Sequence, residues 1–194
     1  MSARDDILTA VRAALADVSP AVSVPAAPRV PDRGDLVTLF VERVEDYRAV
    51  VTRCGAADLA DVVAEALGAR TCVVPPGLDL EVPNAVVDRG FTADELDAID
   101  AVVTRARVGI AETGTIVLDH QPDQGRRAIS LVPDLHVCIV DVSQVVADVP
   151  DAIALVDPAR PLTWISGPSA TSDIELDRVE GVHGPRTLHV VLVG

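Results

Sequence analysis

Short runs of apolar residues, separated by segments with helical periodicity, constrain the fold of this chain more than any other feature. The run from Thr71 to Val74 is followed directly by Pro75-Pro76-Gly77 and contains no alternation of apolar and polar side chains. A strand without alternation is typical of a parallel sheet that is covered on both faces. Because such runs alternate with helical patterns, the sequence predicts a single α/β layered domain with a mostly parallel sheet.

The helical patterns lie between these runs. Apolar residues at helical spacing predict helices over residues 4–16, 36–47 and 59–67, and Gly68 is expected to end the last of them. Thr92 followed by Glu95 resembles a capping box that opens a further helix. Helical turns are expected near 127–131 and 150–156. The expected strands cover residues 49–52, 71–74, 101–103, 116–118, 136–140, 162–165 and 188–193.

The N-terminal part predicts a helix joined to the rest by a linker. Residues 1–18 contain the amphipathic pattern, with Ser2 and Asp5 as a weak capping box. Residues 19–34 are rich in proline and alanine, and proline fixes φ and removes a backbone donor. We expect residues 1–18 to form a tethered helix, residues 19–34 an extended linker and residues 35–194 the domain.

The charge of the chain excludes several classes of function. The formal net charge is −14, and all sixteen basic side chains are arginines. A basic stripe for nucleic-acid phosphates is therefore not expected. Without lysine there is no Schiff-base lysine and no Walker-type phosphate lysine. No Gly-x-Gly-x-x-Gly sequence is present, so a dinucleotide fingerprint is missing.

The three cysteines are widely spaced, and no Cys-x-x-Cys pair occurs. Cys54, Cys72 and Cys138 predict neither a disulfide framework nor the four thiolates that an iron–sulfur cluster usually needs. We expect no cofactor on this chain. No apolar stretch approaches the roughly 20 residues of a membrane helix, and the acidic N-terminus is a poor signal peptide. A cytoplasmic protein without a membrane span is expected.

The first candidate site segment is a loop of small and polar residues before the run at 116–118. It contains one carboxylate, Glu112, followed by Thr113, Gly114 and Thr115. A buried Glu112 is a candidate general base, and the small residues would let the backbone approach a ligand. Alternatively, the segment is a tight turn in which Glu112 caps backbone amides.

The second segment joins two arginines to a histidine. In a regular element Arg126 and Arg127 point to different faces, so we expect only one of them to bind a carboxylate or phosphate. His136 begins an apolar run. It is a candidate proton-transfer group near neutral pH, and the alternative is a structural hydrogen-bonding role.

The third segment, residues 165–175, follows a predicted strand, and the fourth, residues 181–186, precedes the last predicted strand. Hydroxyl-rich loops after strands predict an anion site at a helix start, with a simple N-cap and turn as the alternative. Asp173, Glu175 and His183 could in principle bind a metal, but their spacing matches no known signature, and no metal site is expected. The candidate substrate-binding residues here are Ser166, Gly167, Ser169, Thr171, Asp173 and His183.

Taken together, these segments resemble the LUD domain, the lactate-utilization domain. The resemblance rests on Ala111-Glu112-Thr113-Gly114-Thr115, Arg127 with Leu131-Val132-Pro133 and His136, the run from Ser166 to Glu175, and Gly181-Val182-His183-Gly184-Pro185-Arg186. It is strongest from about residue 101 onwards. The resemblance implies the fold of the superfamily that contains glucosamine-6-phosphate deaminase, ribose-5-phosphate isomerase and the CoA transferases.

The resemblance also implies a function. It implies a component of a system that oxidises L-lactate to pyruvate, with iron–sulfur clusters on two partners, lactate utilization proteins A and B. Glu112, Arg127, Ser169, Thr171 and His183 would line an anionic cleft, in which Arg127 binds the carboxylate of a small anion such as L-lactate. Glu112 or His136 would accept the hydroxyl proton. The alternatives are an independent enzyme for a phosphorylated or CoA-linked molecule, and a non-catalytic scaffold or regulatory subunit.

Overall fold

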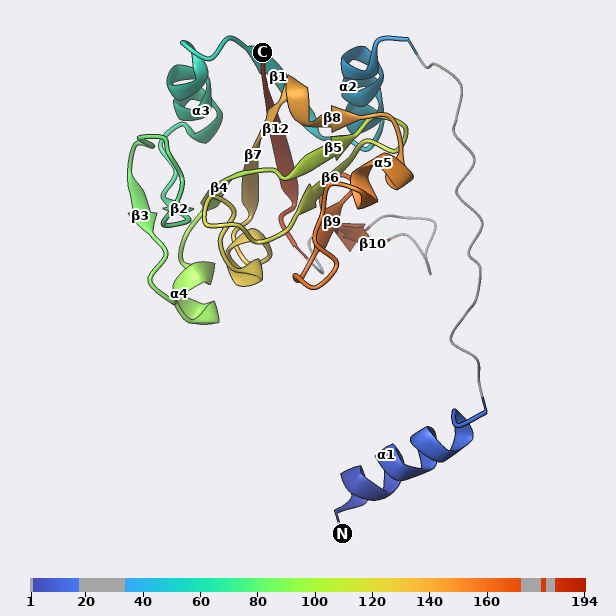
Figure 1. The fold of residues 1–194 in the computed structure, drawn as a ribbon. Coiled ribbons are helices and arrows are strands. Elements are labelled where there is room, and N and C mark those ends of the chain that lie inside the picture. The colour runs from blue at the N-terminus through green and yellow to red at the C-terminus, as the bar shows by residue number, and fades with distance from the viewer. Residues whose placement is uncertain (1, 18–33, 172–178, 181–183) are drawn as a thin grey trace.

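The computed structural model describes residues 2–17, 34–171, 179–180 and 184–194 (Figure 1). Helices and strands are interleaved along the chain, as the sequence predicts. The helices are α1 Ala3–Ala14, α2 Leu36–Asp46, α3 Leu59–Leu67, α4 Ala93–Asp97 and α5 Val149–Ile153, with 3₁₀ turns η1 Arg127–Ser130 and η2 Val142–Gln144. None of the helices in these ranges is long and apolar enough to cross a membrane.

Six parallel strands form the main sheet, in the order β1-β12-β7-β4-β2-β3. The longest pairing joins β7 and β12 in register from Leu135↔Thr187 to Asp141↔Val193. The strands are β1 Val50–Cys54, β2 Cys72–Val74, β3 Ala85–Val87, β4 Ala101–Arg105, β7 Leu135–Asp141 and β12 Thr187–Val193. The mostly parallel sheet that the apolar runs predict is therefore confirmed.

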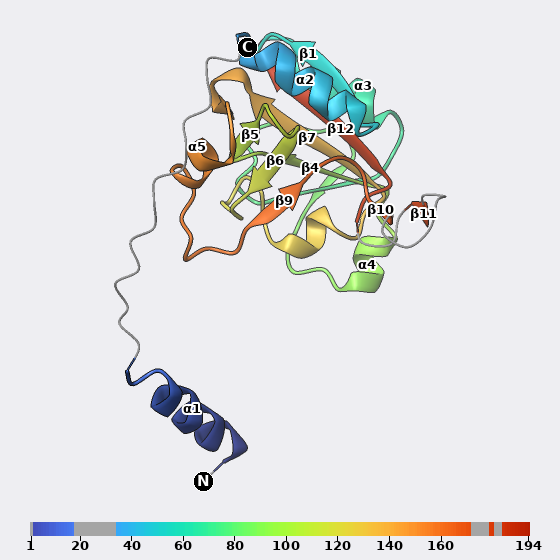
Figure 2. The same ribbon diagram turned by 90° about the vertical axis from the view of Figure 1, so that its right-hand side faces the viewer.

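A second, four-stranded sheet lies over one face of the main sheet, as Figure 2 shows. Its order is β8-β5-β6-β9, and the pairings β5–β6 and β6–β9 are antiparallel. Its strands are β5 Val108–Ile110, β6 Thr115–Leu118, β8 Val145–Val146 and β9 Thr163–Ile165; a separate short ribbon pairs β10 Ala170–Thr171 with β11 Val179–Glu180.

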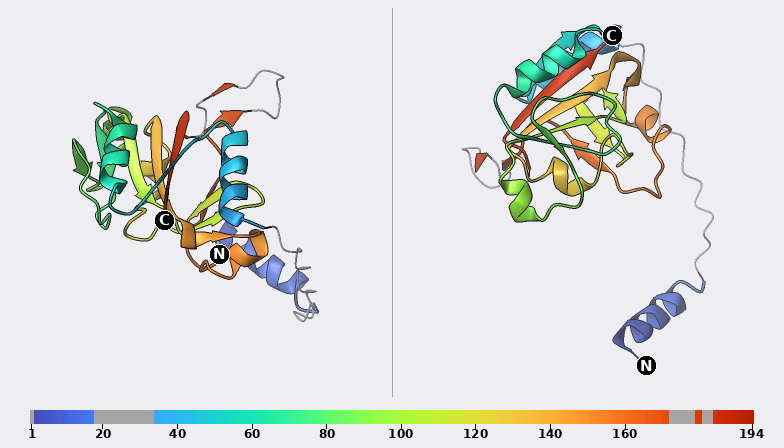
Figure 3. Two further views of the ribbon diagram at one scale, coloured as in Figure 1. Left: turned by 90° about the horizontal axis from the view of Figure 1, so that it is seen from above. Right: turned by 90° about the vertical axis from the view of Figure 1, so that its left-hand side faces the viewer.

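The main sheet is covered on both faces, which explains its unalternating apolar strands. Helix α3 packs on one face through Leu59, Val63 and Leu67. Helix α2 packs on the other face, together with the second sheet, and Phe40 and Val44 are the buried residues of this helix. Seen from above, the two helices lie on opposite sides of the sheet (Figure 3).

The helix ends follow the predicted signals. Ser2 with Asp5 and Thr92 with Glu95 both form complete capping boxes. Gly68 follows α3 with a φ of +60°, a conformation that glycine adopts without a steric penalty. These three sequence signals are confirmed.

Two expectations from the sequence are corrected. The segment from Gly109 to Thr115 is not a loop throughout, because Val108–Ile110 pairs with Thr115–Leu118 and leaves only residues 111–114 as a turn. Strand β3 was not expected from the sequence. It lies at the edge of the sheet and is half-exposed. Nearly all of the predicted linker, residues 19–33, and the helix start expected after the loop that follows β9 lie outside the described residues.

Candidate functional site

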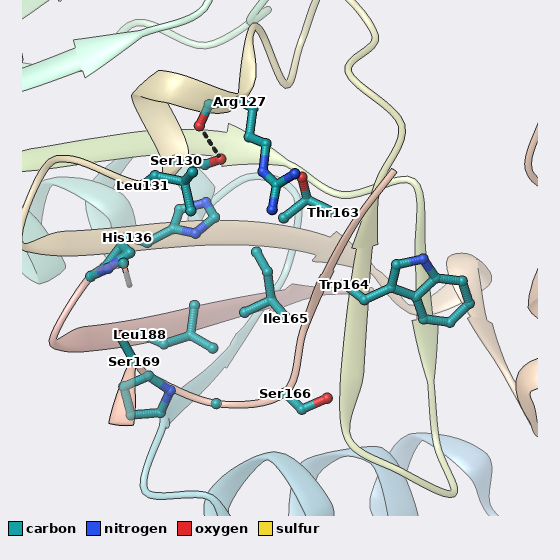
Figure 4. A pocket seen from close by; sticks show the side chains of 14 residues that line it. Arg127, Ser130, Leu131, His136, Thr163, Trp164, Ile165, Ser166, Ser169 and Leu188 are labelled. Atoms are coloured by element: carbon teal, nitrogen blue, oxygen red, sulfur yellow. Dashed lines mark hydrogen bonds between the residues drawn. The ribbon is translucent and has the colours of Figure 1, made fainter. Parts of the chain in front are cut away.

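A pocket lies where strand β9 and the amino-terminal ends of β7 and β12 approach each other. Its volume is about 190 Å³. Pockets for drug-sized ligands span about 300–1,000 Å³, so this one suits a molecule of few atoms. The pocket is lined by Arg127, Ser130, Leu131, His136, Thr163, Trp164, Ile165, Ser166, Gly167, Pro168, Ser169, Gly184, Pro185 and Leu188 (Figure 4).

The pocket adjoins opposite ends of the strands in the two sheets. Ligand sites in open α/β sheets usually lie at the carboxyl ends of the strands. Here the pocket does adjoin the carboxyl end of β9, which ends at Ile165, but β9 belongs to the second sheet. On the main sheet the pocket touches His136 and Leu188, the second residues of β7 and β12.

Arg127 is the cation of this pocket. Its backbone belongs to η1, and Figure 4 shows its guanidinium reaching between His136 and Thr163. Among the described residues, no carboxylate forms an ion pair with it. An arginine that is not neutralised beside a small cavity is suited to bind an anion with its planar fork of donors.

The neighbouring arginine has a different function. Arg126 donates from Nε to Asp88 at 2.7 Å and from Nη2 to the same carboxylate at 2.9 Å and to the carbonyl of Phe91. These bonds hold the pKa of Asp88 below its ordinary value. Arg126 therefore fixes the loop after β3, and Arg127 is the one that lines the pocket.

His136 forms part of the pocket wall but is almost fully buried, with 1% of its surface exposed. Its Nε2 lies 2.8 Å from the hydroxyl of Thr104 on the neighbouring strand β4. Burial lowers the pKa of His136 to about 4, because a charged imidazolium would lose its hydration. The ring is thus neutral at physiological pH.

A line of hydroxyls joins the β5–β6 turn to the pocket. The side-chain oxygens of Thr113 and Thr115 are 2.8 Å apart, and that of Thr115 is 2.8 Å from the hydroxyl of Ser166. Ser166 lines the pocket. Gly114 lies in the turn with a φ of +58°, pressed against the backbone of α2.

Glu112 lies in the same turn but is not a lining residue of the pocket. Its backbone N–H donates to the carbonyl of Ala147, after β8, and the residue is exposed. Residues 111–114 form a turn, as the alternative interpretation has it, and the capping of backbone amides by Glu112 stays a prediction. The structure does not bring Glu112 to the lining of the pocket with Arg127 and His136.

The predicted site residues therefore divide into four groups. The pocket brings together Arg127, His136, Ser166, Gly167 and Ser169. Thr113, Gly114 and Thr115 lie next to it in the β5–β6 turn and at the start of β6, and Glu112 lies apart. The backbone of Thr171 is in β10, and Asp173, Glu175 and His183 lie outside the described residues.

Sequence reasoning missed Thr163 and the apolar side of the pocket. Thr163 lies in β9 and pairs with Leu118 of β6. Its hydroxyl shares a hydrogen bond of 3.0 Å with Nε2 of His120. The apolar side includes Leu131, Ile165 and Leu188. Apolar residues in strands are normally assigned to the core, so no local signal distinguishes these three.

Comparison with known proteins agrees with this α/β architecture. The LUD domain family model matches residues 77–193. Lactate utilization protein C of Deinococcus radiodurans is 45% identical over 205 aligned residues, which cover 99% of this chain and 96% of the relative. Lactate utilization protein C of Bacillus subtilis is 36% identical over 99 residues, covering 47% of this chain and 41% of the relative.

A solved structure is also similar. The crystal structure of a DUF162 family protein from Deinococcus radiodurans has a TM-score of 0.73 and 42% sequence identity, and covers 85% of this chain and 100% of its own. The interleaved helices and strands, with their mostly parallel sheet, define an α/β domain. The chain belongs to the LUD domain family.

Proposed function

We propose that this chain acts in lactate utilization, as a lactate utilization protein C, and that the pocket binds L-lactate through Arg127. The observation that supports this proposal best is the guanidinium of Arg127. It lies at a cavity of about 190 Å³ and forms no ion pair with a described carboxylate. The relatives are named lactate utilization protein C, and we therefore choose lactate as the anion.

The lining of the pocket suits each part of lactate. Arg127 would bind the carboxylate with two parallel N–H groups. Ser166 and Ser169 carry hydroxyls that can bond to the α-hydroxyl, and Leu131, Ile165 and Leu188 offer an apolar surface for the methyl group. The combination of one cation, several hydroxyls and a small apolar wall fits a short hydroxy acid.

The proposed reaction is the oxidation of L-lactate to pyruvate by a complex of this chain with two iron–sulfur proteins. Lactate loses two protons and two electrons, and the electrons would pass to clusters on lactate utilization proteins A and B. His136 lines the pocket and is the first candidate for the hydroxyl proton; Glu112 is the second. In this proposal the chain works in the cytoplasm and carries no cofactor of its own.

Lactate binding is tested by calorimetry on the purified full chain. Arg127→Gln should weaken L-lactate binding by about 10- to 100-fold, since hydrogen bonds to charged groups contribute about 1.5–3 kcal/mol. Arg127→Lys should retain part of the affinity. Arg43→Gln is the matched control, because Arg43 is an exposed arginine on α2 with an i,i+3 partner, Asp46. Equal affinities for wild type and Arg127→Gln would contradict the proposal.

The reaction is tested by reconstitution. Pyruvate formation with an artificial electron acceptor is measured for the chain alone, for the two iron–sulfur proteins alone and for the complete mixture. We expect activity only in the complete mixture, with loss on His136→Gln or Glu112→Gln identifying the proton acceptor. Activity that persists without this chain would favour a scaffold or regulatory subunit.

A specific observation favours the scaffold alternative as the second candidate. Helix α1 has no buried residue, and Ile7, Val11 and Leu15 lie exposed on one side of it. Removing residues 1–33 tests whether this helix assembles the complex. Loss of assembly with lactate binding intact would support a docking role for α1, whereas unchanged assembly and activity would exclude that role.

A further inference from the structure

A second hollow adjoins the pocket and shares Arg127 with it. Its volume is about 640 Å³, and it is more open than the pocket. The residues that line it come from the loops after β2 and β6, from the start of η1 and from the segment before β9. They are Pro76, His120, Gln121, Pro122, Gly125, Arg126, Arg127, Arg160 and Pro161.

The hollow is positively charged in a chain whose formal net charge is −14. Three of the nine lining residues are arginines, and no lining residue is acidic. Asp88 neutralises Arg126. Arg127 and Arg160 form no ion pair with a carboxylate among the described residues, so two positive charges at this hollow are not neutralised there.

Arg160 is held in place by the backbone of the facing loop. Its Nε donates to the carbonyl of Asp119 at 2.9 Å, and its Nη2 donates to the carbonyl of His120 at 3.0 Å. Carbonyl oxygens orient the guanidinium without neutralising its charge. The donors that these two bonds do not use remain available to a ligand, and little side-chain entropy is lost when it binds.

The wall between the hollow and the pocket is rigid. Nδ1 of His120 lies 2.9 Å from the carbonyl of Gly125, which can only accept, so Nδ1 carries the proton. In the neutral ring, Nε2 then accepts from the hydroxyl of Thr163 at 3.0 Å. Gly125 has a φ of +70°, and a Cβ there would lie 2.7 Å from the side chain of Ile129. These contacts separate the two cavities, and Arg127 lines both of them.

We propose that this hollow binds a phosphate or phosphoryl group, held by Arg127 and Arg160. Two unneutralised guanidinium groups match a dianion better than a monocarboxylate, and planar forks of donors suit phosphate oxygens. Since the chain has no lysine, arginine is the only side chain that can supply a permanent positive charge here. When an anion binds in the hollow, Arg127 either turns away from the pocket or contacts ligand groups in both cavities.

The first test is a calorimetric titration of the full chain with inorganic phosphate at constant ionic strength. Saturable binding is expected, weakened at least 10-fold by Arg160→Gln and by Arg127→Gln and left unchanged by Arg43→Gln. Arg160→Lys keeps the charge and should keep part of the affinity, and circular dichroism checks that each variant is folded. No saturable binding, or binding that neither Arg160→Gln nor Arg127→Gln weakens, would overturn the proposal.

A second titration separates a free phosphate from a phosphorylated small molecule. The probe is 2-phospho-L-lactate, which places a phosphate group beside a carboxylate. Binding at least 10-fold tighter than that of phosphate, with displacement of lactate, indicates one ligand in both cavities; affinity equal to that of phosphate indicates a free phosphate. Phosphate binding that requires Arg160 stands even if lactate does not bind, because Arg160 lines the hollow and not the pocket.

Discussion

Adjacent arginines at positions 126 and 127 illustrate how neighbouring side chains acquire different functions. Arg126 forms an ion pair with the almost fully buried carboxylate of Asp88, whereas Arg127 lies between two cavities. The sequence predicts that the two side chains diverge. It does not predict that Asp88 is the partner of Arg126, because 38 residues separate them in the chain.

Asp88→Asn should lower the free energy of unfolding by about 2 kcal/mol at neutral pH, because the charged hydrogen bonds of Arg126 are lost. The lowered pKa of Asp88 means that its contribution is present above the ordinary pKa of 3.8 and is lost as the pH falls through the folded-state pKa. Urea unfolding at pH 7 and at pH 3 measures both effects.

The control for this substitution is Asp134→Asn. The ion pair of Asp134 with Arg186 is exposed on both sides, at 51% and 60%, and exposed pairs contribute about 0–1 kcal/mol. Equal losses from the two substitutions would show that the burial of Asp88 has no energetic role.

His136 gives a prediction for the pH range around 5. Its pKa falls from 6.5 in the unfolded chain to about 4 in the fold, so the unfolded state binds the proton first. Stability contributed by the neutral ring is complete above pH 6.5 and is lost as the pH falls towards 4, by up to about 3 kcal/mol. His136→Gln should flatten the decline of the unfolding free energy between pH 7 and pH 4.5. An unchanged slope would contradict the assigned burial.

The part of the site that could be predicted from sequence is the part with chemically distinctive residues. Arg127, His136 and Ser166 stand out because a cation, an imidazole and a hydroxyl after a strand each indicate a ligand. Arg160 does not stand out, because its bonds run to backbone carbonyls 40 and 41 residues away. Only the folded loops show that it faces a cavity.

At the scale of elements, the β5–β6 turn makes a close backbone contact with α2 next to the site. A Cβ on Gly114 would lie 2.7–2.8 Å from the backbone of Arg43 and Val44, and its φ is +58°. Backbone atoms cannot move aside as a side-chain end can. The turn and the helix therefore depend on glycine at this position.

Gly114→Ala should lower the free energy of unfolding by about 3 kcal/mol, from the left-handed backbone and the overlap together. Gly90→Ala is the control, because Gly90 has a φ of +93° and a Cβ there would meet no heavy atom within 4 Å. It should cost only about 1–2 kcal/mol. Thermal or urea unfolding compares the two, and a smaller loss for Gly114→Ala would refute the assigned contact.

Elements with strong local signals were predicted well, and the shortest ones were not. Helices α2, α3 and α4 follow from caps and apolar periodicity, and β7 and β12 from long apolar runs. Strands β8, β10 and β11 contain only two residues each. A two-residue strand has no period of its own, so its partner across the sheet determines it.

For the whole molecule, the burial pattern predicts that the N-terminal helix adds nothing to the stability of the domain. No residue of α1 is buried. A chain without residues 2–33 should unfold at the same urea concentration as the full chain, and it should bind lactate and phosphate equally well. A loss of more than about 1 kcal/mol would show that α1 packs on the domain in solution, since surface changes rarely exceed about 0.5 kcal/mol.

The three thiols report on the integrity of the core. Burial raises the pKa of Cys72 and of Cys138 to about 12, and both side chains are fully buried, whereas Cys54 is half-buried. Because the thiolate is the reactive form, a thiol reagent should label Cys54 first and the other two only after unfolding. Cys54→Ser should abolish labelling of the native protein. Rapid labelling of all three thiols would contradict the burial.

The class of fold was predicted from sequence, but the arrangement of the strands was not. Apolar runs between helices indicate a parallel sheet that is covered on both faces. Strand order depends on which runs pair, and all the buried runs have similar composition. The second sheet was missed although β6 and β9 were expected as strands, because the three-residue strand β5 carries no clear alternation and nothing local assigns a strand to one sheet or the other.

The pairing of β1 with β12 also determines when the protein can fold during its synthesis. Strand β1 covers residues 50–54, and β12, its partner, covers residues 187–193. β12 also joins β1 to β7, so the ribosome must have made the residues of β12 before the sheet can close. Until then β1 has no partner strand, and pairings so distant in sequence form slowly. The nascent chain therefore depends on dilution or on chaperones for most of its translation, and a chain truncated before residue 187 should aggregate.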